Sequence, residues 1–429
     1  MGRRRIRAMD LEVVTIGTEL LLGHTIDTNA AYLARALAAV GVRVARKTSV
    51  PDTPDAIRDA VAGALARTGF VVTTGGLGPT RDDLTRQAIA ELYAVPLLLD
   101  EAYLERLRAR WRRLGRPGSM PEANRTQAQY PAGATVLPNP RGSAPGLWLE
   151  GSIGVVVMLP GVPHELQGLT DEELVPRLEK RAPVGAVTTS LTLRTTGIPE
   201  SQLADLVGPL EDGLAPVTLA YLPTFDGVDL RLTAWQMPAG EAEALIGRAR
   251  DRLLAVVADR CYGEDGADLA AVVLERARAA GARLAVAESC TGGLVAARLT
   301  AIPGASAVFV GGVVAYENAV KVSELGVPER TIQTEGAVSE GVVRAMAAGA
   351  QRRFGAEAAI AVTGIAGPEG GTAEKPVGTV WLCAAWGASQ QAVRVGVPGD
   401  RAEVRGRAAQ AALDLMRRIL PAPPAAAGR

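Results

Sequence analysis

Hydrophobic and polar positions in the N-terminal part of the chain follow two alternating patterns. Short apolar runs, at 11–16 and 70–74, are closed by glycine, and each precedes a segment with apolar residues three or four positions apart, at 28–40 and 82–93. The runs are typical of buried strands, and the spaced positions predict helices with one packed face. Because strands and helices alternate, the sequence predicts an α/β domain built on a parallel sheet.

The pattern changes after residue 182. Apolar and polar residues alternate at 190–196 and 229–235, which predicts strands with one solvated face in a small α+β module. Near Gly266 a further set of buried strands and amphipathic helices begins, so a second α/β domain is expected there. We therefore predict three domains, which span residues 1–181, 182–262 and 263–422.

Charge and composition narrow the class of protein. The 429 residues include 46 lysines and arginines and 46 aspartates and glutamates, and this balance removes the usual electrostatic argument for direct nucleic-acid binding. The 3 cysteines lack paired spacing, which indicates a reducing compartment and no zinc site. No apolar run reaches the ~18 residues of a membrane helix, and the start of the chain is a poor signal peptide. We therefore expect a soluble, cytoplasmic protein that does not bind membranes.

One candidate nucleophile stands where a buried strand gives way to a helix. Ser289 follows the apolar run 283–288 and precedes Gly292 and Gly293 at the start of the next helix. Such a turn exposes a side chain and directs free backbone N–H groups at the same space, where they can hold an oxyanion or a phosphate. The alternative is that Ser289 and Thr291 only cap the helix.

A serine nucleophile requires a base, and the composition restricts the choice. The 2 histidines, His24 and His164, both lie in the N-terminal domain, so a Ser-His-Asp triad confined to the C-terminal domain is excluded. Lys321 follows Tyr316 at a spacing that lets both reach one pocket, and burial would have to keep its amine neutral. The alternatives are that Lys321 is an ordinary exposed helix lysine and that Cys290 is the nucleophile, although no histidine is near enough to ionise its thiol.

Glycine-rich turns after buried strands supply further candidates. The segments 74–83 and 363–371 both follow such strands, and both suit a close backbone approach to phosphate or ribose. In the first turn, Asp82 and Asp83 carry the oxygen ligands that Mg²⁺ prefers. The alternative is that these two carboxylates only favour the start of a helix.

Five motifs occur together in the C-terminal domain. They are Ala287-Glu-Ser-Cys-Thr-Gly-Gly293, Tyr316-Glu-Asn-Ala-Val-Lys321, Gly336-Ala-Val-Ser339, Ala361-Val-Thr-Gly-Ile-Ala-Gly-Pro368 and Lys375-Pro-Val-Gly-Thr-Val380. In order and spacing they resemble the nicotinamide-nucleotide amidase domain, which implies hydrolysis of nicotinamide mononucleotide to nicotinate mononucleotide and ammonia without a cofactor. The resemblance implies that Ser289 is the nucleophile, Lys321 the base, and Tyr316 and Thr363 their network partners. The substrate contacts expected from it are Thr291, Gly292, Gly293, Gly364 and Gly367.

The N-terminal motifs are Gly17–Gly23 with Asp27-Thr-Asn29, Thr74–Asp83, Pro138–Gly146 and Leu159–Glu165. They resemble the molybdopterin-binding-like domain of the CinA family, which implies an ADP-ribose pyrophosphatase that requires Mg²⁺, Mn²⁺ or Co²⁺. The resemblance implies nucleotide contacts at Asn29, Gly75, Gly76 and Thr80 and a metal contact at Asp83. Thr126 departs from the pattern, because many relatives are expected to carry a second basic residue there.

These expectations combine into one hypothesis. The chain resembles full-length CinA, with a three-layer α/β domain, a small KH-like α+β module and a C-terminal α/β amidase domain. It is expected to be a homodimeric enzyme of pyridine-nucleotide salvage whose ligands are nicotinamide mononucleotide and ADP-ribose. Two alternatives stay open: the first domain is a non-catalytic nucleotide- or molybdopterin-binding module, or the whole chain is an interaction protein linked to competence or DNA damage.

Overall fold

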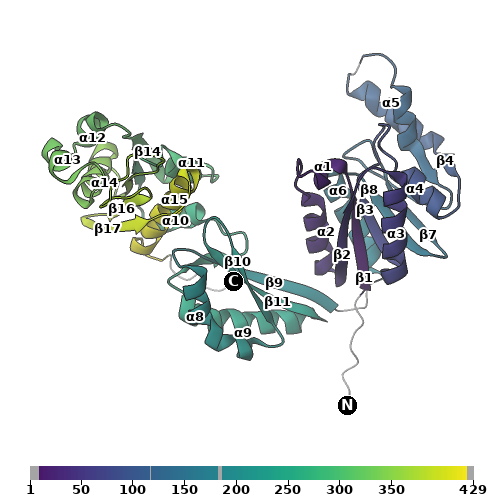
Figure 1. Cartoon of the computed structure of the whole chain (residues 1–429), viewed down its shortest axis with the longest axis horizontal. Coiled ribbons are helices and arrows are strands. Elements are labelled where there is room, and N and C mark those ends of the chain that lie inside the picture. The colour runs from purple at the N-terminus through teal and green to yellow at the C-terminus, as the bar shows by residue number, and fades with distance from the viewer. Residues whose placement is uncertain (1–8, 116, 182–185, 423–429) are drawn as a thin grey trace. The chain divides into compact units, whose positions relative to one another are not determined.

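The computed structural model describes residues 9–115, 117–181 and 186–422. Contacts divide the chain into two compact units, which are Met1–Thr189 with Ala234–Ala244 and Ser190–Thr233 with Leu245–Arg429. The predicted boundary between residues 181 and 182 falls at the edge of a segment outside the described residues, so the three-domain division stays a prediction. Figure 1 labels the elements of both units.

The first unit contains a six-stranded mixed sheet in the order β2-β1-β3-β8-β7-β6. Strands β1, β2, β3 and β8 are parallel, as predicted, but β7 and β6 are antiparallel additions. The sequence analysis missed this edge because only two residues separate Gly151 from Gly154, and so short a turn connects antiparallel strands alone. The strands are β1 (Met9–Ile16), β2 (Val42–Val50), β3 (Phe70–Thr74), β6 (Thr135–Leu137), β7 (Gly146–Gly151) and β8 (Gly154–Leu159), with a separate antiparallel pair β4 (Leu97–Leu99) and β5 (Gln129–Pro131).

Helices cover both faces of this sheet, which confirms the predicted three-layer α/β class. Apolar residues of α2 and of the segment from α6 to α7 pack on one face, and those of α3 and α4 pack on the other (Figure 1). The helical segments are α1 (Thr18–Leu21), α2 (Thr28–Ala39), α3 (Pro54–Thr68), α4 (Thr85–Leu92), α5 (Glu101–Arg113), η1 (Glu122–Ala128), α6 (Pro163–Leu169), the π-helical η2 (Thr170–Leu174) and α7 (Val175–Glu179).

The small module has the predicted α+β composition. Its four-stranded sheet has the order β10-β11-β9-β12, and β10 pairs with β11 and β12 with β9 in antiparallel fashion. Its elements are β9 (Ala186–Thr195), α8 (Glu200–Glu211), η3 (Asp212–Leu214), β10 (Thr218–Pro223), β11 (Val228–Pro238), α9 (Ala239–Val257) and β12 (Cys261–Glu264).

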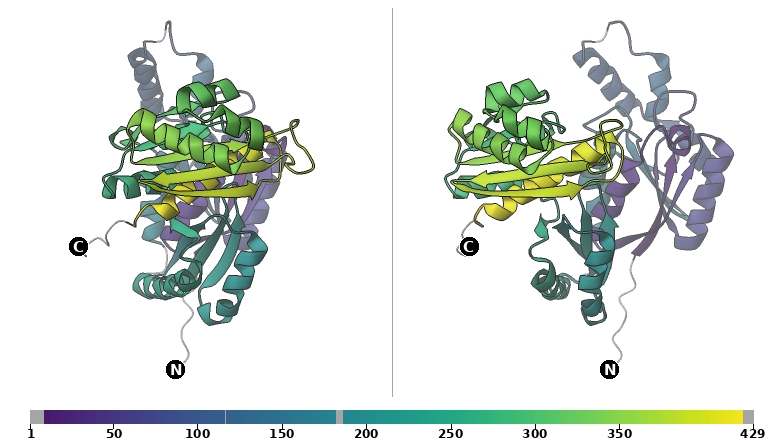
Figure 2. Two further views of the ribbon diagram at one scale, coloured as in Figure 1. Left: turned by 90° about the vertical axis from the view of Figure 1, so that its left-hand side faces the viewer. Right: turned by 60° about the vertical axis from the view of Figure 1, so that its left-hand side comes forward.

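The C-terminal sheet has the order β14-β13-β15-β16-β17. Strands β14, β13 and β15 are parallel, and β16 and β17 extend the sheet in antiparallel fashion. Figure 2 shows helices on both faces of this sheet. The elements are α10 (Leu269–Ala279), β13 (Leu284–Glu288), α11 (Leu294–Thr300), η4 (Ala305–Ala307), β14 (Phe309–Val314), α12 (Asn318–Leu325), α13 (Glu329–Glu335), α14 (Glu340–Phe354), β15 (Ala358–Gly364), β16 (Thr379–Trp386), β17 (Ser389–Gly396) and α15 (Arg401–Ile419).

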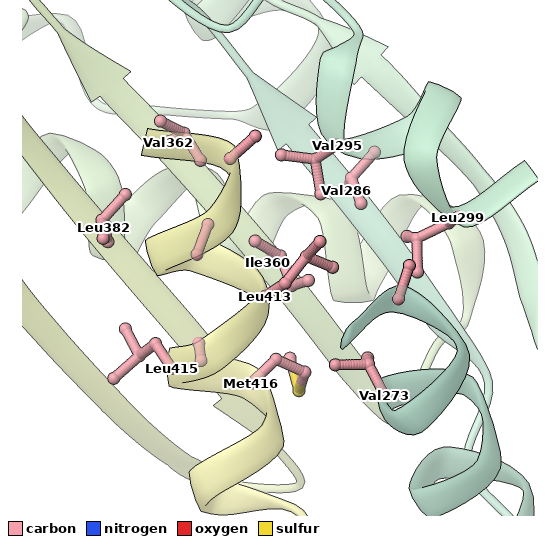
Figure 3. Packing of buried hydrophobic residues seen from close by; sticks show 14 of the residues in the cluster. Val273, Val286, Val295, Leu299, Ile360, Val362, Leu382, Leu413, Leu415 and Met416 are labelled. Carbon is pink, nitrogen blue, oxygen red and sulfur yellow. The ribbon is translucent and has the colours of Figure 1, made fainter. Parts of the chain in front are cut away.

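Aliphatic side chains fill the core of this sheet domain. Val286 and Ile360 from the sheet meet Val273 of α10 and Leu413 and Met416 of α15 (Figure 3). The opposite face of the sheet is covered by α12 and α14. The central strands are therefore buried on both faces, which fixes the positions of their ends. Within the parts of the chain that the structure describes, no helix is both long and apolar enough to cross a membrane.

Candidate active site

Three neighbouring strand ends bring the predicted catalytic residues together. Ser289 follows β13, Ala315 follows β14 and Thr363 lies near the end of β15. The Ser289 N–H donates to the Val362 carbonyl at 2.9 Å, and the Ala315 N–H donates to the Glu288 carbonyl at 2.7 Å. Since the carboxyl ends of parallel strands are where α/β sheets bind ligands, this edge is the candidate active site of the second unit.

Lys321 is buried, so its interpretation as an ordinary exposed helix lysine is wrong. The residue is 1% exposed, and Nζ donates to the carbonyls of Ala315 at 2.9 Å and Tyr316 at 3.2 Å. No carboxylate among the described residues forms an ion pair with this amine, and burial lowers the pKa of Lys321 below its ordinary value. A neutral amine has two N–H groups and one lone pair. Because the two carbonyls accept both N–H groups, the lone pair is left to accept a proton.

The first turn of α11 is closed by a carboxylate. Glu288, which is 1% exposed, accepts the backbone N–H groups of Gly293 at 3.0 Å, Val295 at 3.1 Å and Ala296 at 2.8 Å. The sequence analysis expected these N–H groups to be free for an oxyanion or a phosphate, and this expectation is wrong. The alternative that Ser289 caps the helix is wrong as well, because Glu288 satisfies the helix end and the serine hydroxyl is not used for it.

The two N–H groups directly after Ser289 differ from those of the helix. Those of Cys290 and Thr291 donate to no backbone carbonyl in the described part of the chain, and they lie against the Cys290 sulfur. Burial raises the pKa of the Cys290 thiol to about 12, so the thiol stays protonated at neutral pH. Cys290 is 4% exposed, so it packs as a small buried side chain.

The Tyr316 side chain lies with an arginine rather than with the lysine. Its hydroxyl accepts a hydrogen bond from Arg401 Nη2 at 2.6 Å, and Arg401 Nη1 donates to the Gly367 carbonyl at 2.7 Å. Arg405, one turn later on α15, donates through Nη2 and Nε to the Thr291 carbonyl at 2.9 and 3.3 Å. Neither guanidinium forms an ion pair among the residues with described positions, so both leave positive charge at the site.

The sequence analysis did not name either arginine. The only signal was their spacing of four on a helix that begins after the capping residue Asp400, which places both side chains on one face. Nothing in the sequence indicates that this helix, more than a hundred positions away along the chain, returns to the strand end at Thr291. The contact is a product of the sheet order.

Thr363 positions a neighbouring loop. Thr363 is 1% exposed, and its hydroxyl donates to the Ala337 carbonyl at 2.8 Å. Lys375 Nζ holds the same loop by donating to the carbonyls of Glu335 at 2.7 Å and Val338 at 2.9 Å. The motifs at 336–339 and 375–380 therefore meet beside the end of β15.

The predicted substrate contacts surround this edge in different ways. Gly292 and Gly293 have φ angles of 60° and 93°, and glycine adopts this left-handed turn without steric cost. The Thr291 hydroxyl is buried without a hydrogen-bond partner among the described residues. Gly364 packs tightly, because an added Cβ would lie 3.0 Å from the Cys290 sulfur, and the Gly367 carbonyl is held by arginine as described above.

The predicted nucleotide contacts of the first unit also lie at strand ends. Asn29 Nδ2 donates to the Gly161 carbonyl at 2.7 Å and to Thr74 Oγ1 at 3.3 Å, which joins the start of α2 to the ends of β3 and β8. Gly75 approaches the neighbouring strand so closely that a Cβ would lie 2.2 Å from the Ile16 carbonyl oxygen. In the same turn, a Cβ on Gly76 would lie 2.1 Å from Thr85 Oγ1. These glycines therefore shape the turn that was predicted to hold a phosphate.

A buried arginine, which the sequence analysis missed, supports this turn. Arg86 is 3% exposed and donates to the carbonyls of Leu77 and Gly78, each at 2.8 Å. Burial lowers the pKa of Arg86 to about 10, which still leaves the guanidinium charged at neutral pH. The residue was overlooked because a single arginine in a helical segment is ordinarily exposed and gives no sequence signal of burial.

Asp83, the predicted metal contact, is engaged in the loop itself. Its Oδ1 accepts the Gly78 N–H and its Oδ2 accepts the Thr80 N–H, each at 2.7 Å, and the Thr80 hydroxyl also donates to Oδ2. Among the described residues there is no group of three or more His, Cys, Asp or Glu side chains that would hold a metal ion. The residues present therefore do not form a metal-ligand set of their own, and the metal role of Asp83 stays a prediction.

Comparison with known protein families divides the chain into three matches. Residues 266–420 match the CinA C-terminal domain, residues 190–263 match the damage-inducible protein CinA KH domain, and residues 12–180 match the family described as "Probable molybdopterin binding domain". The three matches account for the α/β, α+β and α/β parts described above.

Curated relatives match nearly the whole chain. A CinA-like protein from Gemmatimonas aurantiaca is 52% identical over 413 residues, which cover 96% of this chain and 96% of the relative. A CinA-like protein from Anaeromyxobacter dehalogenans is 43% identical over 414 residues, covering 96% of this chain and 100% of the relative. The chain belongs to the CinA family.

Solved structures match parts of the chain. One is the competence/damage inducible protein CihA from Agrobacterium tumefaciens, with 43% identity, a TM-score of 0.34, and coverage of 34% of this chain and 91% of that one. Another is the protein CinA from Thermoplasma acidophilum, with 34% identity, a TM-score of 0.36, and coverage of 41% of this chain and 98% of that one.

Replacing Glu288 tests the cap of α11. We expect Glu288→Ala to lower the free energy of unfolding by about 2–4 kcal/mol, because three N–H groups lose their acceptor in a buried place. The matched control is Glu335→Ala, because the exposed Glu335 carboxylate accepts one N–H, from Gly341 at 3.2 Å, and its loss should cost less than about 1 kcal/mol. Urea unfolding followed by circular dichroism measures both, and equal losses would contradict the cap.

Proposed function

We propose that the second unit hydrolyses the carboxamide of nicotinamide mononucleotide, with Ser289 as nucleophile and Lys321 as base. The observation that carries the proposal is the buried Lys321 amine, which rests on two carbonyls at the strand end beside Ser289 and has no carboxylate partner among the described residues. An amine in this environment loses its proton more easily than an exposed one, and a serine hydroxyl needs such a base. The rival nucleophile, Cys290, remains protonated.

The proposed reaction has two steps. Ser289 Oγ attacks the carboxamide carbon while its proton passes to the lone pair of Lys321. The C–N bond then breaks, and the proton on Lys321 leaves with the nitrogen as ammonia. Water attacks the resulting ester with Lys321 again as base, which releases nicotinate mononucleotide and restores the serine.

Two arginines fit the charge of this substrate. Arg401 and Arg405 reach the edge of the site from α15 and have no ion-pair partner in the described structure, whereas the nucleotide carries a phosphate. Guanidinium groups bind phosphate through charge-assisted hydrogen bonds. We therefore assign the phosphate to these two side chains and the carboxamide to Ser289.

The nucleophile and the base are tested by ammonia release from nicotinamide mononucleotide. We expect Ser289→Ala to reduce kcat by about 10³-fold or more, because no second nucleophile replaces the hydroxyl. Lys321→Arg keeps the positive charge but removes the deprotonated amine, so it should be similarly inactive. The control Ser323→Ala, on the exposed side of α12, should retain full activity. Ammonia release that persists in Ser289→Ala would exclude this mechanism.

The phosphate assignment is tested with a pair of substrates. Arg405→Ala should raise KM for nicotinamide mononucleotide about tenfold or more, since a charge-assisted hydrogen bond is lost. Hydrolysis of nicotinamide riboside, which lacks the phosphate, should change little in the same variant. Arg283→Ala serves as the matched control, because Arg283 directly precedes the start of β13, at the other end of the strand from Ser289. An equal loss with both substrates would show that Arg405 supports the fold instead.

For the first unit we propose nucleotide binding at the ends of β1, β3 and β8. The support is that Asn29 and the glycine turn at 74–83 lie at the same strand ends. The Asp83 carboxylate accepts two backbone N–H groups of that turn. This favours a binding role over the metal-dependent ADP-ribose pyrophosphatase, which together with the homodimer stays a prediction from the sequence.

Calorimetry with ADP-ribose tests the binding role. We expect the full chain to bind ADP-ribose without added metal and Asn29→Ala to weaken that binding about tenfold, because the variant frees two strand ends that Asn29 joins. The absence of any binding would contradict the proposal. Release of AMP after adding Mg²⁺, Mn²⁺ or Co²⁺ would reinstate the pyrophosphatase.

A further inference from the structure

A cavity of the second unit lies away from Ser289. It has a volume of about 590 Å³ and lies between loops of the small module and the face formed by β16, β17 and α15. Cavities of this size commonly hold one small organic molecule. None of the residues predicted for either active site lines it, and we call it the junction cavity.

The body of the junction cavity is apolar. Val393 and Val395 of β17 and Ala411 and Leu415 of α15 line its inner side. Phe225, from the loop between β10 and β11, closes it from the small module and lies directly over Gly406, where a Cβ would come within 2.3 Å of the ring. A ligand therefore meets aliphatic and aromatic surface over most of the space.

One end of the cavity carries an excess of positive charge. The Asp414 carboxylate is shared by two guanidiniums, because Arg417 binds Oδ1 at 2.8 Å and Arg418 binds Oδ2. A third, Arg260, donates to the Gly197 carbonyl at 3.2 Å and forms no ion pair among the described residues. Arg417 lies behind the wall, so Arg418 and Arg260 are the guanidiniums that this end of the cavity presents beside the Asp414 carboxylate.

Arg260 and Arg418, the two of these arginines that line the cavity, converge where Gly197 has no side chain. From the position that a Cβ would take there, Arg418 Nη2 lies at 3.1 Å and Arg260 Nη1 at 4.0 Å, and Asp414 Oδ2 lies at 3.4 Å. The other acid of the wall, Asp226, faces Arg298 at 3.9 Å. The remaining charge is unbalanced, and an anionic group at this end would compensate it.

The walls of the cavity are held in place by buried polar contacts within the unit. Gln410, which is 3% exposed, donates to Thr196 Oγ1 at 3.3 Å and accepts from Arg298 at 2.7 Å. Arg417, 4% exposed, also donates to the carbonyl of Asp259 at 2.8 Å. Satisfied buried networks of this kind fix the geometry of the elements they join, so the cavity is pre-formed.

We propose that the junction cavity binds a small organic anion with an apolar body, its acidic group at Arg260 and Arg418 and its body on the face of β17 and α15. This is a second ligand site, and it does not depend on the amidase activity proposed for Ser289. The chemistry is that of an aliphatic or aromatic carboxylate or phosphate monoester.

The test uses 8-anilinonaphthalene-1-sulfonate, a fluorescent aromatic anion, with the full chain. We expect saturable binding of one dye molecule, displaced by octanoate or by octyl phosphate but not by octylamine. The two anions distinguish a carboxylate from a phosphate ligand. No saturable binding, or displacement by octylamine as strong as by octanoate, would overturn the proposal.

Variants place the dye in this cavity. Arg260→Gln should weaken dye binding about tenfold through the loss of one charged donor, whereas Arg248→Gln, an exposed change on α9, should leave it unchanged. Ala411→Phe should abolish binding by filling the space, and a circular-dichroism spectrum and urea unfolding midpoint equal to those of the unaltered chain report that its fold is intact. If Arg260→Gln and Arg248→Gln bind the dye equally well, the site is elsewhere and the proposal fails.

Discussion

The second unit depends on the burial of one amine. Lys321 lies inside the protein on two backbone carbonyls, and no acid among the described residues balances it. Such a placement costs free energy unless the amine loses its charge, and the lowered pKa of Lys321 expresses this cost. Strand β14 ends and α12 begins so that these carbonyls face the amine, and the adjacent strand end presents Ser289. Lys321 suits the proposed role of a base because the fold removes its amine from water.

The charged side chains around the Lys321 amine are kept apart from it. The acid nearest Ser289 in sequence is Glu288, and its carboxylate accepts three N–H groups at the start of α11. It therefore forms no ion pair with Lys321 that would favour the charged form of the amine. The cations that stay unpaired, Arg401 and Arg405, sit at the edge of the site. A buried amine of lowered pKa inside and positive charge at the rim suit a substrate with an uncharged amide and an anionic tail.

Helix α15 links this site to the rest of the unit. Its first turns carry Arg401 and Arg405. Its later turns carry Gly406, which packs under Phe225 of the small module, and Gln410 and Asp414, which line the junction cavity. A ligand in that cavity would lie against the same rigid helix that holds Arg405. The small module therefore has a direct structural connection to the helix that carries Arg401 and Arg405.

The sequence by itself determined the fold class and most helix and strand positions, and it nominated Ser289 and Lys321 as nucleophile and base, because hydrophobic periodicity and motif spacing are local properties. It did not determine that Lys321 is buried, that Glu288 rather than Ser289 caps α11, or that β7 joins the first sheet in antiparallel fashion. Only the tertiary structure decided these points, and it also brought Arg401 and Arg405 to the strand ends. The reason is physical: burial, charge pairing and the pKa of a side chain depend on neighbours that the order of strands brings together from distant parts of the chain.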